Sequence, residues 1–556
     1  MIAGTLCFLI GVYDLFAGVR AHVPPHLEWV GDYIPGAVES LARTATVIVG
    51  MLLLLLSHAL RRRKRRAWEA AVLLLSLSVV FHLVRGLFVV PALIGAVLLG
   101  LLVYYRGEFY ASGDPRTRWR AVWVFCLMVG FSLLFGLAYI RFNHHHLAMA
   151  YGLTDRLEEV VLGLVGITGP VVFDSAARAA FGATTLGALG LLTALVTAYL
   201  LFRPAKPVPS HDAEDERRMR DLLRRHGARD SLGYFALRKD KSVIWSPTGK
   251  ACVTYRVVAG VMLASGDPLG DPEAWPGAIH AFLDEAARHA WVPAVMGCGE
   301  LGGEVWTRES GLDAIELGDE AIVDVGGFTL SGRSMRNVRQ MVTRVERQGY
   351  EARLRRVADV SAEELADIEA QAGAWLGRET ERGGFSMALG RIGAPGDAAC
   401  AVATAHHEGK LAAVLHFVPW GEDGLSLELM RRDRAAAPGL NDFLIVYALR
   451  HAGELGVRRL SLNFAVFRSA LERGERLGAG PVLRVWRGIL LFLSRWFQIE
   501  SLYRFNAKFG PTWEPRFIVF PHRRDWPRIA FAAMEAEAFL TFPHPDLGRL
   551  RRLVGR

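Results

Sequence analysis

Long apolar runs dominate the first 205 residues and limit the folds open to the chain more than any other feature. Six stretches approach the ~20 apolar residues needed to cross a bilayer core. They lie at residues 1–18, 42–60, 67–84, 86–105, 121–140 and 182–202. The whole chain is 52% hydrophobic, which is too apolar for an ordinary soluble protein. We therefore predict an N-terminal α-helical transmembrane bundle of about six spans.

Basic residues between these stretches predict the orientation of the bundle. Residues 61–66 read RRRKRR, and residues 106–120 bring further arginines to the next loop on the same side. Short cytoplasmic loops of membrane proteins are enriched in Lys and Arg, so this side is expected to be the cytoplasm. The first stretch lacks the basic leader and the small-residue cleavage site of a signal peptide, and we count it as a span. The C-terminal part is then predicted to be cytoplasmic.

Polar groups within the membrane half are few. Asp14 lies inside the first predicted span, where a carboxylate usually faces a polar cavity or a partner, so it is a secondary candidate site residue. The histidines at 144–146 are adjacent and do not converge as metal ligands, which favours a solvated loop. Residues 154–178 have the pattern of an amphipathic segment at the membrane surface. The five cysteines are scattered without paired spacing, so no metal site or disulfide framework is predicted.

A change in composition divides the chain near residue 205. The segment RPAKPVPSHDAEDERR is rich in proline and charge and has no hydrophobic periodicity, which is typical of a linker. Beyond it, strand-like apolar runs alternate with amphipathic helices, and the pattern occurs twice. The predicted organisation is a transmembrane domain at 1–203, a linker at 204–218, a first α/β unit at 219–356 and a second at 357–545.

Residues 331–356 concentrate arginine on one side of a predicted helix at 333–347. The apolar positions at helical spacing, which should be buried, are Met335, Val338, Val342 and Val345. The basic positions opposite or flanking them are Arg333, Arg336, Arg339, Arg344 and Arg347, with Asn337 nearby. Guanidinium groups suit phosphate, and the net charge of +9 favours anionic lipid or nucleic acid as a partner. The alternative is a solvated helix without a ligand.

Five motifs in the C-terminal half carry a resemblance to a known family. They are GDPLGDP at 266–272, SGRSMRNVR at 331–339, RGGFSMALGR at 382–391, LSLELMRR at 425–432 and YRFNAKFGPTWEPRFIVF at 503–520. Together, over roughly residues 215–525, they resemble the aminoacyl-phosphatidylglycerol synthase domain of the multiple peptide resistance factor family. The resemblance implies two tandem acetyltransferase-like (GNAT) units on the cytoplasmic side of a bacterial inner membrane.

The same resemblance implies an activity. Enzymes of that family transfer an amino acid, here expected to be lysine or alanine, from aminoacyl-tRNA to the headgroup of phosphatidylglycerol. The product lowers the negative surface charge and gives resistance to cationic antimicrobial peptides. With about six spans the chain resembles the synthase-associated part alone, so lipid flipping is not expected. It shows no fused lysyl-tRNA synthetase, so charged tRNA would come from elsewhere. Homo-oligomerisation is left open.

Transfer between esters of similar energy requires no ATP and no metal, and we predict no cofactor; neither a GxxxxGK[ST] loop nor zinc-ligand spacing occurs. The reaction does require a base for the lipid hydroxyl and a cation for the oxyanion. In the last motif, Lys508 and Arg516 are the candidate cations, unless they form a structural corner. Trp513 is a stacking or packing surface beside them.

Glu428 is the candidate general base. An alternating strand should place it on the face opposite Leu427, away from the core. There it either pairs with Arg431 and Arg432, acts as the base, or contacts the amino group of the substrate. We expect Glu428 and Lys508 to share one active site. The candidate substrate-binding residues are Arg333, Arg336, Asn337, Arg339, Arg431, Arg432, Asn463 and Trp513, with Asp267 as a turn residue or a secondary site residue.

Two alternatives to this function are kept. The acceptor lipid could be diacylglycerol instead of phosphatidylglycerol, which changes the product and not the class of reaction. A non-catalytic membrane protein that binds anionic lipid or RNA through its basic domain would also explain the positive charge.

Overall fold

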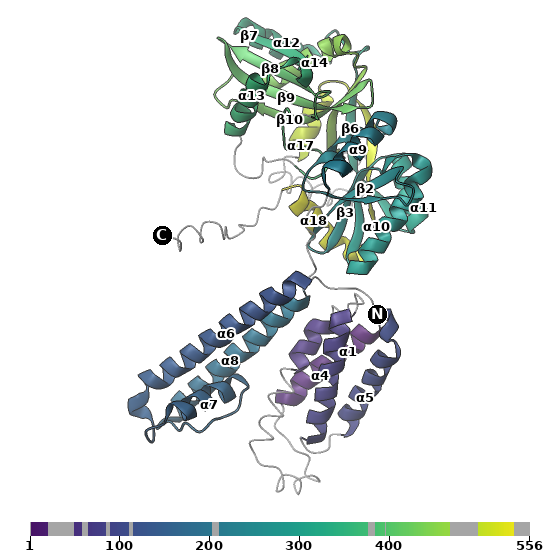
Figure 1. Ribbon diagram of the computed structural model, residues 1–556. Helices are drawn as coiled ribbons and strands as arrows, with labels where there is room; N and C mark the ends of the chain where they lie inside the picture. Colours follow the sequence, from purple (N-terminus) through teal and green to yellow (C-terminus); the bar gives the residue numbers. More distant parts are fainter. Residues whose placement is uncertain are drawn as a thin grey trace, which may run out of the picture. The chain divides into compact units, whose positions relative to one another are not determined.

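The computed structural model describes residues 2–19, 49–57, 60, 65–84, 89–109, 115–202, 211–375, 384–394, 396–466 and 499–538. The chain divides into two compact units, which meet in the sequence at Ala205 and Lys206. The first unit is helical and the second is built on one large β-sheet (Figure 1).

The first unit contains two helical groups. In one, α1 (Ile2–Val19) and α4 (Arg65–Val84) pack against α5 (Val89–Tyr104). In the other, α6 (Pro115–Phe142) and α8 (Ala176–Phe202) form a pair, and the short α7 (Leu153–Leu164) packs against both. A Cβ atom on Gly190 of α8 would lie 1.9 Å from the carbonyl oxygen of Leu164, so only glycine allows this close approach.

Apolar side chains point outward from these helices, as they would toward lipid. Leu73, Leu93 and Leu134 are 62%, 62% and 71% exposed. Among the described residues, two helical segments are long and apolar enough to cross a membrane, at Ala121–Phe142 and Ala176–Leu200. Helix is present within each of the six predicted ranges, but the count of six spans stays a prediction. Residues 42–48 and 58–59 of the second range and the basic residues 61–64 lie outside the described residues.

The polar groups of the first unit have local partners. Asp14 is fully buried and accepts a hydrogen bond of 3.0 Å from the Ser78 hydroxyl of α4. His146 lies 2.9 Å from Asp174. Within the described residues, no three His, Cys, Asp or Glu side chains group together as metal ligands. The helix of the predicted amphipathic segment is α7, and residues 165–175 after it are not helical.

The second unit has a 12-stranded sheet within the described residues, in the order β1-β2-β3-β5-β12-β6-β11-β10-β9-β8-β7, with β4 beside β2. The first strands are β1 (Ser242–Trp245), β2 (Ala251–Val258), β3 (Val261–Ser265), β4 (Leu269–Gly270), β5 (Val292–Cys298) and β6 (Asp313–Asp324). The others are β7 (Tyr350–Arg356), β8 (Ala401–His407), β9 (Lys410–Trp420), β10 (Gly424–Arg432), β11 (Arg459–Val466) and β12 (Thr512–Phe520). The helices are α9 (Ala213–His226), α10 (Trp275–His289), α11 (Glu300–Ser310), α12 (Arg336–Arg347), α13 (Ala362–Ala374), α14 (Leu440–His451), α17 (Ile499–Ala507) and α18 (Trp526–Ala536).

The two halves of this sheet repeat one pattern and exchange their last strands. In each half a strand, a helix and a parallel strand follow one another: β3, α10, β5 in the first half and β10, α14, β11 in the second. A further helix and strand close each half, α11 with β6 and α17 with β12. However, β12 pairs with β5 of the first half, and β6 pairs with β11 of the second. Neither half therefore completes its sheet alone.

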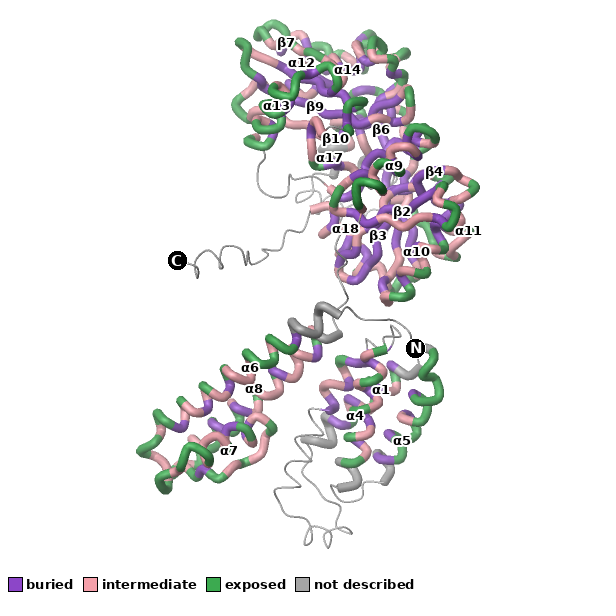
Figure 2. Tube along the Cα trace, in the orientation of Figure 1, coloured by how far each residue is buried: buried purple, intermediate pink, exposed green. Residues whose placement is uncertain are grey.

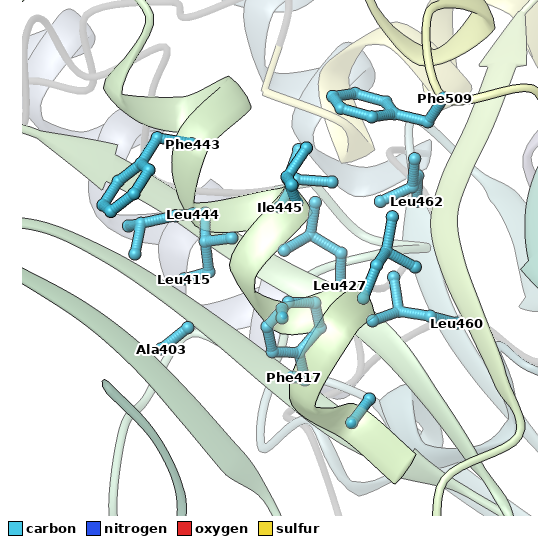
Figure 3. Packing of buried hydrophobic residues seen from close by; sticks show 14 of the residues in the cluster. Ala403, Leu415, Phe417, Leu427, Phe443, Leu444, Ile445, Leu460, Leu462 and Phe509 are labelled. Atoms are coloured by element: carbon cyan, nitrogen blue, oxygen red, sulfur yellow. The ribbon is translucent and has the colours of Figure 1, made fainter. Parts of the chain in front are cut away.

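The largest core cluster lies in the second half (Figure 3). Phe443, Leu444 and Ile445 of α14 pack there with Phe417 of β9 and Leu460 of β11. The central strands are largely buried, as Figure 2 shows. A predominantly apolar run such as β9, in which residues 411–418 are all buried, is what a sheet covered on both faces requires.

The predicted boundary at residue 356 is wrong for one segment. It assigns 333–356 to the first unit, but β7 pairs with β8, and Val338, Val342 and Val345 of α12 join the core of the second half. These valines are buried as predicted. The helix begins at Arg336, so Arg333 lies in the turn before it.

Candidate functional site

Glu428 lies at an irregularity of β10, and the prediction that it points away from the core is wrong. The pairing of β10 with β9 shifts register between Leu427 and Leu429. A β-bulge of this kind breaks the alternation of side chains between the two faces. The Glu428 side chain is 1% exposed, and its Oε2 lies 2.9 Å from Nδ1 of His416. Its partner is therefore His416, not Arg431 or Arg432.

Burial alone would lower the pKa of His416, but its contacts with Cys400 and Glu428 outweigh burial and raise that pKa to about 10. Asn463 supports the same bulge, because its side-chain amide donates to the carbonyl oxygen of Leu427. Its backbone has φ 69°, a conformation that Asn tolerates better than most residues.

The second oxygen of Glu428 fixes a segment without regular structure, residues 384–391. Oε1 accepts hydrogen bonds from the backbone N–H groups of Leu389 (2.9 Å) and Gly390 (3.0 Å). The RGGFSMALGR and LSLELMRR motifs therefore meet through this carboxylate. An irregular segment has no ladder to satisfy its backbone, so side chains must supply partners.

Two other charged side chains hold the same segment. Arg238 donates through Nη1 to the carbonyl oxygens of Gly384 (2.9 Å) and Ala388 (3.0 Å). Glu537, at the end of α18, accepts from the backbone N–H of Ser386 at 3.0 Å. The three side chains come from three separate elements, so the conformation of the segment depends on both halves of the sheet.

The segment forms one wall of a pocket of about 430 Å³. The opposite walls come from α13 and β10. The lining residues are Glu369, Ala372, Gly373, Ala388, Gly390, Arg391, Ile392, Glu428, Leu429, Met430 and Arg431. This volume is within the range of about 300–1,000 Å³ that is usual for small-molecule sites. The pocket therefore has apolar walls interrupted by two acidic and two basic side chains.

Arg516 is not an available cation. It is 4% exposed, Nη1 lies 2.7 Å from Asp230, and Nη2 forms an ion pair with Glu320. Nε donates to Glu320, Nη1 to Gly297 and Nη2 to Ser231 as well. These contacts use all five N–H donors of a guanidinium. Burial would lower the pKa of Arg516, but Glu320 and Asp230 raise it. Arg516 therefore links β12 to β6 through Glu320 and to the first half through Asp230. This is the structural role that the sequence left open for it.

Asp267 lies beside this cluster. Its Oδ1 accepts from the backbone N–H of Gly299 at 2.8 Å, at the start of α11. A Cβ atom on Gly302 would lie 1.9 Å from that oxygen, so glycine is required there. Burial first, and then Asp230, raise the pKa of Asp267 to about 7 against the lowering effect of Arg516. Asp267 therefore does more than form a turn, because its buried carboxyl group holds the start of α11.

We expect Asp267→Asn to change how stability depends on pH. The Asp267 carboxyl has a higher pKa in the folded state than the ordinary aspartate pKa of about 4 that it has when unfolded, so its ionisation destabilises the fold as pH rises from about 4 to about 7. Asn does not ionise, so the variant lacks this loss of stability. Its stability relative to wild type should rise by roughly 1–3 kcal/mol between pH 5 and pH 8, measured by thermal unfolding of the purified chain. Asp284→Asn, on the exposed face of α10, is the control. A parallel pH dependence for wild type and Asp267→Asn would contradict this account.

Glu428→Ala should destabilise the protein by about 2–4 kcal/mol, because it leaves Nδ1 of His416 and two buried backbone N–H groups without their partner. Glu428→Gln keeps a carbonyl oxygen for those N–H groups and should lose less. Denaturant unfolding of both variants, with the exposed Glu422→Ala as control, measures the difference. Equal losses in the two variants would show that the N–H contacts contribute nothing.

Lys508 and Glu428 are not in contact. Lys508 Nζ lies 2.8 Å from Asp442 of α14, and its side chain is 43% exposed. Trp513 packs against the core cluster of the second half, with its ring 5.5 Å from that of Tyr503. Arg432 donates to the carbonyl oxygens of Asp433 and Ala436. Of the predicted site residues, only Glu428 and Arg431 line the pocket.

The arginines of α12 lie apart from the pocket lining. Arg333, Arg336, Arg344 and Arg347 are exposed, as is Asn337. For the side chains of these four arginines the described residues provide no hydrogen bond or ion pair. Arg339 differs, because its Nη1 donates to the carbonyl oxygens of Leu330 and Gly332. The turn before α12 thus uses one arginine and leaves the others at the surface.

Sequence reasoning missed several residues that shape the site. They are Asp230, Arg238, Glu320, His416 and Glu537. A signal existed for His416, which is the polar residue inside the otherwise apolar run 411–418 of β9. Glu320 gave no such signal, because β6 contains several other acidic residues. Arg238 and Glu537 lie in ordinary polar surroundings in the sequence, and only the fold brings them to residues 384–391.

Comparisons with known proteins agree with the motifs. Residues 220–520 match the family model described as "Phosphatidylglycerol lysyltransferase, C-terminal", and residues 1–202 match "Transmembrane region of lysyl-tRNA synthetase". The chain is 40% identical over 554 residues to the lysylphosphatidylglycerol biosynthesis bifunctional protein LysX of Rhodococcus opacus (strain B4), covering 98% of this chain and 48% of that protein. It is 47% identical over 392 residues to the protein of that name from Mycobacterium avium (strain 104). That match covers 70% of this chain and 33% of the Mycobacterium avium protein.

The chain thus spans about half, or less, of the length of these relatives. Among solved structures, L-PGS from Bacillus licheniformis is 23% identical, with a TM-score of 0.49, over 60% of this chain and 99% of that one.

Proposed function

The chain belongs to the phosphatidylglycerol lysyltransferase family, and from this premise we propose that it transfers lysine from lysyl-tRNA to the glycerol headgroup of phosphatidylglycerol. The match of residues 220–520 to the family model carries the proposal, and it confirms the resemblance predicted from the motifs. The match of residues 1–202 to a transmembrane region makes the chain a membrane protein. Alanine as the amino acid is less favoured, because the relatives are named for lysylphosphatidylglycerol.

The pocket beside residues 384–391 is where we place the aminoacyl ester. Both motifs that meet at Glu428 line it. Transfer between two esters of similar energy requires no ATP, so holding the two reactants in the right geometry can supply much of the rate enhancement. Because Glu428 holds His416 and two N–H groups, we propose that it fixes the pocket wall, while a general base for the lipid hydroxyl stays unassigned.

Lys508 is the cation that we assign to the lipid phosphate. An ammonium has three N–H donors, and the contact with Asp442 uses one of them. Its partly exposed side chain leaves the rest accessible. Arg516, in contrast, has all its donors in use.

We further propose the finer organisation predicted from the sequence. It comprises about six spans in a bacterial inner membrane with the second unit in the cytoplasm, and a linker before two acetyltransferase-like halves. The linker predicted at 204–218 must end earlier, because α9 begins at Ala213. The repeated strand, helix and parallel-strand order supports the two halves. Aminoacylation would lower the negative charge of the membrane and so weaken binding of cationic antimicrobial peptides.

Lipid analysis tests the function directly. Cells that express the chain should contain lysyl-phosphatidylglycerol, which mass spectrometry of extracted lipids detects and which cells without the gene lack. Alanyl-phosphatidylglycerol would change the amino acid, and an aminoacylated diacylglycerol would change the acceptor. Absence of any aminoacylated lipid in the presence of lysyl-tRNA would favour a non-catalytic protein that binds anionic lipid or RNA.

We assign the tRNA phosphates to the exposed arginines of α12. Arg336 and Arg347 are three turns apart on the face opposite the buried valines, and the intervening acid Glu346 does not pair with them in the structure. Unpaired guanidinium groups on a docked helix suit the phosphates of a nucleic acid backbone.

Each phosphate contact should show in the salt dependence of tRNA binding. Arg336→Ala and Arg347→Ala should each reduce the slope of log affinity against log salt by about 0.7–0.9, because each contact releases counterions. Stability should change by less than ~0.5 kcal/mol, since both residues are exposed. Arg308→Ala, on α11 and paired with Glu309, is the matched control. An unchanged slope in both α12 variants would exclude this helix from the tRNA interface.

A further inference from the structure

The charged groups that line the pocket differ in how far the protein itself uses them. Glu428 is bound to His416 and to two backbone N–H groups. Arg391 donates to Asp397 at 2.8 Å and to the carbonyl oxygen of Leu237 at 3.1 Å. Glu369 of α13 is exposed, and its carboxylate has no hydrogen bond or ion pair within the described part of the chain. It is therefore the carboxylate of the pocket that a ligand can reach without breaking an existing contact.

Apart from Arg391, Glu428 and Arg431, the residues that line the pocket with Glu369 are small or apolar. Ala372 and Gly373 follow it on α13, and no heavy atom lies within 4 Å of where a Cβ on Gly373 would be. Ile392, Leu429 and Met430 form further parts of the lining. A slender aliphatic chain gains from contact with such walls, whereas its charged end requires an opposite charge.

We infer that Glu369 determines specificity for the amino acid by pairing with the side-chain ammonium of the lysyl group, whose methylene chain lies along the apolar walls. The inference rests on the proposed function and adds the residue that distinguishes lysine from alanine. An alanyl group has no ammonium to reach this carboxylate, so it gains nothing from it. Discrimination arises here from a polar contact that only one substrate completes.

Steady-state kinetics of the full-length protein in membranes, with lysyl-tRNA and alanyl-tRNA as substrates, tests the inference. Glu369→Gln should raise KM for lysyl-tRNA by about tenfold, the effect of losing one charged hydrogen bond at a partly solvated site. The value of kcat should stay within about twofold, because the contact is the same in the ground and transition states. Use of alanyl-tRNA should not change. Glu363→Gln, an exposed residue on another face of α13 and outside the pocket lining, is the matched control.

Binding of lysine methyl ester and alanine methyl ester to the purified chain separates this inference from the function. Wild type should bind the lysine ester more tightly, and Glu369→Gln should bind both esters alike. If Glu369→Gln keeps the wild-type preference, the inference is wrong even when lipid lysylation occurs. If the preference depends on Glu369 but no lysylated lipid forms, the subsite stands and the proposed transfer fails. A Glu363→Gln variant with the same loss would also overturn the assignment.

Discussion

The second unit depends on one buried guanidinium. Arg516 lies on β12, the strand that the second half inserts between β5 and β6. Taking a cation out of water costs several kcal/mol unless carboxylates compensate it, and removing one partner of such a pair is strongly destabilising. Asp230 and Glu320 supply that compensation from two other elements. The exchange of strands and the burial of this charge thus require each other, because only the exchanged strand brings Arg516 to both carboxylates.

Buried polar groups are also paired in the loop beside the pocket. Residues 384–391 cross the site without the hydrogen-bond ladder of a strand or the internal bonds of a helix. Arg238, Glu428 and Glu537 instead bind its backbone groups. Small residues such as Ala388 and Gly390 can then face the pocket, since the shape of the wall is fixed by charges behind it. Such preorganisation matters most where the reaction gains little from the chemistry of any single side chain.

Features that depend on neighbouring residues could be predicted from the sequence, whereas features that depend on contacts between distant segments could not. The buried valines of α12 follow from helical periodicity, which is local, and they were predicted correctly. The direction of Glu428 depends on a bulge that its own strand does not encode. The burial of Arg516 depends on a strand exchange between segments far apart in the sequence. Glu428, singled out by motif resemblance, lines the pocket, whereas the partners of Glu428 and Arg516 come from segments that the motifs do not include.

The two halves also differ in charge at corresponding positions. Residues 297–303 of the first half read GCGELGG, a glycine-rich turn that opens α11 after β5. Turns of this kind often bind phosphate at a helix N-terminus. Here the carboxylate of Asp267, just after β3, already accepts the Gly299 N–H. At the corresponding end of β10 the chain places Arg431 and Arg432. The first half satisfies its own helix N-terminus with an internal anion, whereas the corresponding end of β10 has two arginines beside a pocket that is lined by both acidic and basic side chains.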